Sequence, residues 1–197
     1  MILLLLHLHF KSVSMAKFIT TTEISYSIEK MIKGANDFIF IVSPYLKIHQ
    51  RLKAVIEEKL SETNDYFQII FVCKESELQY KNPDELKWLK SQPKSKFYNS
   101  NNLHAKSYLN EEQAIITSMN LYDYSQVNNI EFGLVIEKND EQYNQIVKEV
   151  LKLSSKNLIK EIQQKKKKAT DEQFMLDNKL KTEYQLTDAQ VAAMNEW

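Results

Sequence analysis

The sequence contains little cysteine, glycine or proline: one, two and three residues respectively among 197. A single cysteine excludes an intrachain disulfide framework and a zinc site built from cysteines. The scarcity of glycine and proline argues against collagen-like, linker-like and turn-dense all-β chains. The 26 Lys and Arg residues balance the 26 Asp and Glu residues, which excludes a globally basic nucleic-acid binder but not a local basic patch. Cys73 lies in the apolar run 67–73, so we expect a buried, inert thiol and a protein of the reducing cytoplasm.

The sequence also lacks a long hydrophobic run. Its apolar start is far shorter than the ~20 residues of a membrane span, and no basic region precedes it as in a secretory signal. The first well-patterned segment begins at Met15, so we expect residues 1–14 to be a leader; whether Met1 or Met15 is the true start stays open. His7 and His9 alternate in this leader without a third ligand nearby, so we predict no metal site and no cofactor.

The remaining chain alternates between apolar runs and amphipathic segments. Residues 38–42 and 67–72 are continuous apolar runs, which are typical of strands covered on both faces. Apolar residues at helical spacing follow Thr20, a candidate helix cap, and recur over residues 46–60, so we expect a helix in each segment. A further short helix is expected to begin at Pro83. Further strand-like stretches cover 96–98, 103–109, 114–117 and 130–137. We therefore predict an α/β fold, a mixed β-sheet flanked by helices, in which right-handed crossovers make the first strands parallel neighbours.

The composition changes after residue 163. Residues 143–163 carry an apolar helical stripe, whereas the following residues are polar, with four lysines at 165–168 and a capping-box pattern at 187–190. We therefore predict one domain over residues 15–163 and a polar C-terminal tail over 164–197, helical or disordered. The lysine run is either a solvated helix face or a contact with nucleic acid or an anionic membrane surface.

His104 and Lys106 occupy alternate positions in the predicted strand 103–109. Because alternate side chains of a strand share one face, these two point in the same direction. Leu103 and Ala105 then point into the packing. A neutral imidazole is a nucleophile near pH 7, and an ammonium group stabilises negative charge that develops beside it. The pair therefore favours chemistry at a phosphate group.

Three more polar residues lie where neighbouring strands end or begin: Ser118, Asn120 and Glu131. The Asn120 amide adds a donor for non-bridging phosphate oxygens, and a carboxylate at Glu131 holds an imidazole tautomer. The Ser118 hydroxyl either contacts phosphate or forms a turn. This set suits phosphodiester cleavage, and because no acidic cluster of metal-ligand type lies beside it, we predict metal-independent catalysis.

This stretch resembles the signature of the phospholipase D superfamily, the HKD motif. The family pattern is His-x-Lys, an acid five residues past the lysine, Gly/Ser-Ser-x-Asn, and a glutamate in the following strand. Those places are occupied here, in order, by His104 and Lys106, Glu111, Thr117 to Asn120, and Glu131. Residues 41–45 look like the family's first core strand, which makes Tyr45 a candidate substrate-binding residue. The resemblance implies a phospholipase D-like α/β/α fold over most of the predicted domain.

Two positions depart from the family pattern. Glu111 stands where aspartate is usual, at a position that is generally structural in the family. Thr117 stands where glycine is common, and its β-branch is expected to crowd the turn and alter the shape of the pocket.

The family's mechanism uses two histidines, one that attacks phosphorus and one that protonates the leaving oxygen. This chain has one complete motif, and the only other candidate, His49-Gln-Arg51, has arginine for lysine. A two-fold homodimer that brings His104 to its own copy supplies the second imidazole, as in the small single-motif members that resemble bacterial endonucleases. We predict a metal-independent phosphodiesterase of nucleic acid. The alternatives are a membrane-lipid phosphodiesterase with the same chemistry and a nucleic-acid-binding module without turnover.

Overall fold

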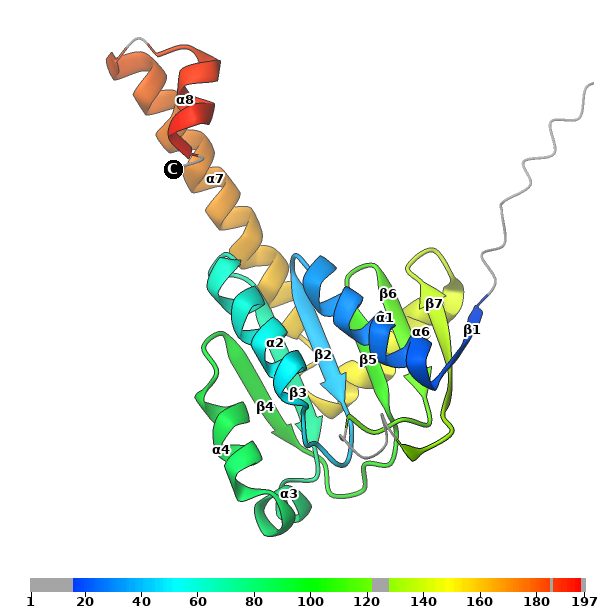
Figure 1. Ribbon diagram of the computed structural model, residues 1–197. Coiled ribbons are helices and arrows are strands. Elements are labelled where there is room, and N and C mark those ends of the chain that lie inside the picture. Colours follow the sequence, from blue (N-terminus) through cyan, green and yellow to red (C-terminus); the bar gives the residue numbers. More distant parts are fainter. Residues whose placement is uncertain (1–15, 122–127, 185, 196–197) are drawn as a thin grey trace, which may run out of the picture.

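The computed structural model describes residues 16–121, 128–184 and 186–195, so the predicted leader lies outside the described residues. A seven-stranded sheet runs in the order β1-β7-β6-β5-β2-β3-β4 and is flanked by helices (Figure 1). The strands are β1 (Lys17–Thr20), β2 (Phe38–Val42), β3 (Gln68–Cys73), β4 (Ser95–Asn99), β5 (Ser107–Asn110), β6 (Gln113–Thr117) and β7 (Phe132–Glu137). The predicted α/β class with a mixed sheet is confirmed.

Two of the six strand pairings in the sheet are parallel and four are antiparallel. β2, β3 and β4 pair in parallel, because α2 (Gln50–Glu62) connects the first two, and α3 (Glu75–Lys81) and α4 (Pro83–Ser91) connect the next two. β5 lies antiparallel on the other side of β2, and β6, β7 and β1 continue the antiparallel half. The predicted parallel pairing of the first two apolar runs is thereby confirmed, whereas the edge strand β1 was not predicted.

Two hydrophobic layers enclose the sheet. α1 (Thr21–Gly34) and α2 cover one face, and α6 (Glu141–Leu153) with the start of α7 (Leu158–Tyr184) covers the other (Figure 1). Every residue of β2 and β3 is buried between these layers, which explains their unbroken apolar sequences. Cys73 lies in this core, and burial raises the pKa of its thiol to about 12, in agreement with the expected inert cysteine.

The α2 helix begins four residues later than the spacing predicts. Leu46 and Ile48 are buried in a loop rather than in a helical turn, and the buried Glu85 carboxylate accepts a hydrogen bond from the Ile48 amide at 3.0 Å. His49 then caps the helix, because its Nδ1 accepts the Arg51 amide at 3.2 Å. The second candidate motif, His49-Gln-Arg51, therefore forms the start of α2 and packs beside α1.

The C-terminal region is helical. α7 is 27 residues long and crosses residue 164 without a break, because lysine is a good helix former. α8 (Asp188–Asn195) folds back onto its outer half, where Val191 is buried. The predicted capping box is present, since the Thr187 backbone amide and hydroxyl both donate to the Gln190 side chain, at 2.9 and 3.0 Å. Among the described helices, none has both the length and the apolar character to cross a bilayer.

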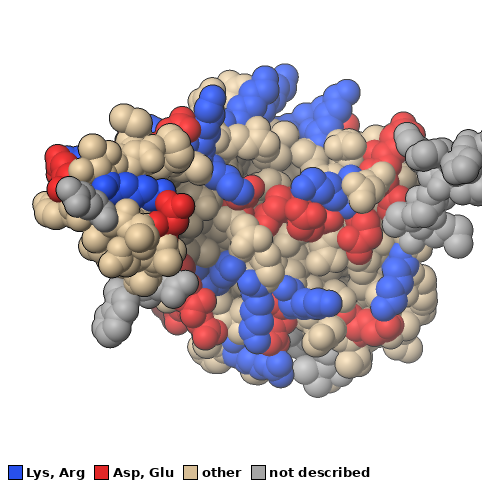
Figure 2. Space-filling view, turned by 90° about the horizontal axis from the view of Figure 1, so that it is seen from above, with Lys and Arg blue, Asp and Glu red and all other residues tan. Residues whose placement is uncertain are grey.

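The face that Figure 2 shows lies away from the carboxyl ends of β2 and β3. Lysine and arginine side chains are interspersed there with aspartate and glutamate (Figure 2). Lys166, from the predicted lysine run, pairs with Asp37 at 2.5 Å, and Lys168 lies 3.6 Å from Glu172. Both lysines thus belong to a mixed, solvated helix surface.

Candidate active site

The candidate site residues lie at one edge of the sheet. Tyr45 follows the end of β2, and His104 and Lys106 precede β5 at the same edge, because β5 runs antiparallel to β2. Ser118 and Asn120 follow β6, and Glu131 directly precedes β7. The alternation of strand direction therefore brings residues from three connections to one edge: the segment after β2, the segment before β5, and the connection between β6 and β7.

His104 and Lys106 lie in an extended segment before β5 rather than within the strand. The hydrogen bonds between β5 and β6 begin beside these two residues, since the Thr117 amide donates to the Lys106 carbonyl at 3.2 Å. His104 is exposed and Leu103 is buried, as predicted, but Ala105 is exposed. The prediction that Ala105 points into the packing is therefore wrong, because the segment has not yet entered the two-sided core of the sheet.

Lys106 is partly buried beside charges of both signs. Desolvation lowers the pKa of Lys106, the Glu131 carboxylate raises it, and the positive charge of Lys74 lowers it further. Lys74 directly follows β3, at the carboxyl end of a parallel strand, and its amide donates to the Pro44 carbonyl at 3.3 Å. This second cation lies outside the residues of the motif and is not among the site residues predicted from the sequence. Its place after a buried strand is the signal that identifies it, because ligands bind at such ends in open α/β sheets.

Ser118 and Glu131 are joined directly. The Ser118 hydroxyl donates to a carboxylate oxygen of Glu131 and accepts the Phe132 amide at 3.2 Å. The other carboxylate oxygen accepts from the Asn129 side chain at 3.0 Å, and the Glu131 amide donates to Thr21 Oγ1 at 2.8 Å. The structure thus pairs Glu131 with Ser118 and Asn129, whereas we predicted that it would hold the imidazole.

Asn120 is fixed through a buried serine after β2. The Ser43 hydroxyl donates to Tyr45 O at 2.8 Å, lies 3.4 Å from Asn120 Oδ1, and accepts the Leu121 amide at 3.2 Å. Behind it, the buried Tyr108 hydroxyl donates to the Met119 carbonyl at 2.9 Å, and burial raises the pKa of Tyr108. The loop that carries Asn120 is therefore attached to β2 and β5 by groups within the core.

The threonine that departs from the family pattern is accommodated by a glycine. Thr117 pairs with Gly133 across β6 and β7. A Cβ at position 133 would lie 3.1 Å from both the Ile116 carbonyl oxygen and Thr117 Cβ, so any larger residue would require these neighbours to move, and glycine avoids this crowding. Thr117 Oγ1 also donates to the Phe132 carbonyl at 2.7 Å, which holds the end of β6 in place. Thr117 also lines the hollow that contains His104 and Ser118, so its expected effect on the shape of the pocket stays a prediction.

Glu111 lies at the opposite end of β5. Its carboxylate accepts hydrogen bonds from the backbone amides of Asn36, Asp37 and Phe38, at 2.5, 3.3 and 3.4 Å. These bonds attach the start of β2 to the turn after β5. Glu111, the acid of the motif, therefore has a structural role, as expected for this position.

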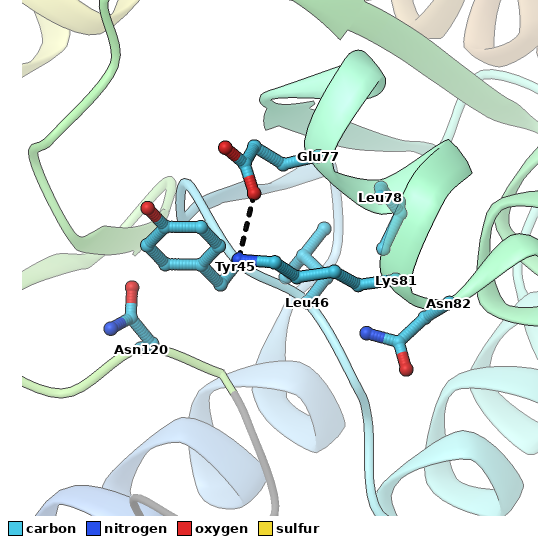
Figure 3. Close-up of a pocket in the computed structure, with 7 residues that line it drawn as sticks. All are labelled: Tyr45, Leu46, Glu77, Leu78, Lys81, Asn82 and Asn120. Carbon is cyan, nitrogen blue, oxygen red and sulfur yellow. Dashed lines mark ion pairs between the residues drawn. The ribbon is translucent and has the colours of Figure 1, made fainter.

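Two hollows adjoin the site. The first, which we call the Tyr45 pocket, has a volume of about 240 Å³ and lies between Tyr45 and α3, with Asn120 on its wall (Figure 3). The second is a wider depression of about 650 Å³ between the site and α6, lined by His104, Lys106 and Ser118. The Asn120 amide thus lines the first hollow, and the exposed imidazole of His104 lines the second.

The sequence matches no protein-family model and no curated protein, but its fold matches solved structures. NucT from Helicobacter pylori superposes with a TM-score of 0.58 at 15% identity, over 71% of this chain and 94% of that one. Nuc from Salmonella typhimurium, described as a phospholipase D family member, gives 0.56 at 11% identity, over 71% of this chain and 93% of that one. Phosphatidylserine synthase from Haemophilus influenzae Rd KW20 gives 0.54 at 11% identity, over 67% of this chain and 35% of that one. The fold is phospholipase D-like, which confirms the resemblance at the level of architecture.

Proposed function

We propose that this protein is a metal-independent phosphodiesterase that hydrolyses nucleic acid through a phosphohistidine intermediate, in a homodimer. The observation that carries the proposal is the grouping of His104, Lys106, Ser118, Asn120 and Glu131 at one edge of a phospholipase D-like sheet. An exposed imidazole, a partly buried ammonium and an amide held from the core are the groups that a phosphoryl transfer needs.

The reaction has two steps. In the first, an imidazole nitrogen of His104 attacks phosphorus, an N–P bond forms, and the P–O bond to the leaving oxygen breaks. The second subunit's His104 gives that oxygen a proton. In the second step this neutral imidazole takes a proton from water, which attacks phosphorus and releases His104 and a phosphomonoester. Lys106 and Asn120 stabilise the negative charge on the non-bridging oxygens in both steps.

An exposed apolar surface supports the dimer. Ile130 and Phe132 flank Glu131 and are 85% and 54% exposed, and the Phe18 ring lies 5.4 Å from that of Phe132. Apolar side chains gathered beside a polar site mark a surface that another protein covers. A two-fold axis through this surface buries it against its copy and brings the two sites together.

Nucleic acid fits the charge of this edge better than a lipid does. Lys74 and Lys81 lie near the Tyr45 ring, and the charge of Lys74 also acts on Lys106, an arrangement suited to a polyanion that carries aromatic bases. The lipid-synthesising neighbour is matched over only 35% of its chain, so most of that protein has no counterpart in the match.

The test is hydrolysis of labelled DNA, RNA and phosphatidylcholine vesicles, each with excess EDTA, by the wild-type protein and by His104→Ala. We expect cleavage of a nucleic acid that persists with chelator and is lost in His104→Ala. Release of phosphatidic acid with nucleic acid intact would identify the lipid enzyme instead. Salt-sensitive binding without turnover or a covalent histidine adduct would identify the binding module.

Subunit mixing tests the shared site. Wild-type subunits are exchanged with an excess of His104→Ala subunits, which forms mixed dimers. If each site needs two copies of His104, these mixed dimers are inactive. Activity then falls as the square of the wild-type fraction. A linear fall, or a fully active monomer in sedimentation velocity, would contradict the dimer.

A further inference from the structure

The Tyr45 pocket extends the site in the direction of α3. The Tyr45 ring forms one wall, the buried Leu46 and Leu78 form its apolar floor, and the amides of Asn82 and Asn120 lie at its margins (Figure 3). The proposed chemistry at His104 uses none of the floor or α3 residues.

The pocket adjoins the site through two links. Asn120 belongs to both, and Ser43 joins it to the Tyr45 backbone through contacts of 3.4 and 2.8 Å. Lys74 forms the second link, because its ammonium lies 5.8 Å from the centre of the Tyr45 ring and its charge acts on Lys106. A ligand group in the pocket therefore lies next to a phosphate at His104.

The lining combines three kinds of group that together match a nucleobase. An aromatic ring over an apolar floor accepts the face of a planar heterocycle, and the two amides offer hydrogen bonds to its edge. Lys81 lies 5.2 Å from the centre of the Tyr45 ring, where its ion pair with Glu77 at 2.8 Å holds it (Figure 3). Lysines at the rim suit the phosphates on either side of a bound nucleotide.

We infer that the Tyr45 pocket binds one unpaired base next to the scissile phosphate, so that the substrate is single-stranded nucleic acid. This inference rests on the proposed function. The pocket, at about 240 Å³, has room for a single base, and a base within a duplex cannot enter it because both its faces are stacked on its neighbours.

The experiment changes the substrate and the enzyme together. Single-stranded oligonucleotides carry one abasic tetrahydrofuran nucleotide at each position around the cleaved bond, and kcat/KM is measured for each. For the wild-type protein we expect a loss of about tenfold when the abasic nucleotide adjoins the cleaved bond, and slower cleavage of the same sequence as a duplex. Tyr45→Ala removes the discrimination between base and abasic nucleotide, and Tyr45→Phe retains it, since stacking requires only the ring.

Tyr80→Ala is the matched control, because this tyrosine lies on α3, the helix beside the pocket, but is 87% exposed, and we expect wild-type discrimination from it. Discrimination that survives in Tyr45→Ala, or a preference for duplex, would overturn the pocket assignment while leaving the nuclease proposal intact. Failure of the wild-type protein to cleave any oligonucleotide would overturn both.

Discussion

The two ends of β5 carry residues of the same motif but have different surroundings. Before the strand, His104 is exposed and Lys106 is partly buried near two other charged groups. After it, the Glu111 carboxylate is bonded to three backbone amides. At the first end an imidazole and an ammonium group remain open to a ligand, whereas at the second end the carboxylate is bonded to the protein's own backbone. A short motif can therefore combine residues for chemistry with a residue for the fold, and hydrogen-bond partners distinguish the two.

The largest effect is expected at the first end. Lys106→Met keeps most of the length of the side chain but removes the charge that stabilises the transferring phosphoryl group in the proposed reaction, so we expect kcat/KM to fall about 10³-fold. The melting temperature stays near that of the wild-type protein. A loss of activity that is explained entirely by unfolding would remove the distinction between the two ends.

At the other end, Glu111→Gln replaces a charged acceptor of three amides by a neutral one. We expect the free energy of unfolding in urea to fall by about 1–2 kcal/mol, with unchanged activity per folded molecule. Glu112→Gln is the matched control, since its ion pair with Lys138 is exposed and is worth less than about 0.5 kcal/mol. Equal destabilisation by both variants would contradict the structural role of Glu111.

The pH dependence sharpens the comparison further. Glu131 raises the pKa of Lys106 and Lys74 lowers it, so Glu131→Gln moves the pKa of Lys106 down and Lys74→Gln moves it up. Activity that depends on charged Lys106 is then lost at lower pH in the first variant and at higher pH in the second. The alkaline limb of the kcat/KM profile measures this shift, and Glu111→Gln, at the distant end, leaves it in place. A shift in the same direction for both variants would contradict the opposite effects of Glu131 and Lys74 on the pKa of Lys106.

The smallest effect is expected from Lys166, which pairs with Asp37 beside Glu111. The hydrogen bond to Asp37 raises the pKa of Lys166, so its contribution to stability is present below the ordinary pKa of 10.5 and is lost as pH rises through the raised value. For Lys166→Gln we expect a loss of about 0.5 kcal/mol at pH 7 and low salt, screened by 1 M NaCl. A larger, salt-independent loss would make this contact part of the core.

Much of the architecture could be predicted because local signals agreed with the final environment. β2 and β3 are unbroken apolar runs and are buried on both faces. The capping box at Thr20 is present, with its amide bonded to Glu23 at 3.0 Å. β1 could not be predicted, because only Ile19 of its four residues is buried and its pairing with β7 defines it.

The candidate site was predictable in its composition but not in its internal contacts. The pairing of Ser118 with Glu131 depends on the register of β6 against β7, which no local pattern encodes. The position of Lys74 depends on the strand order, and the Tyr45 pocket requires α3, a helix that the sequence analysis did not predict.

The single thiol of the chain has a practical consequence. Because Cys73 is buried and holds its proton up to about pH 12, it does not compete for maleimide or methanethiosulfonate reagents near neutral pH. A cysteine introduced at an exposed position such as Tyr80 therefore accepts a spin label selectively in the otherwise native background. Pulsed electron paramagnetic resonance on that protein would yield the separation between two labelled copies, and hence the geometry of any pair they form.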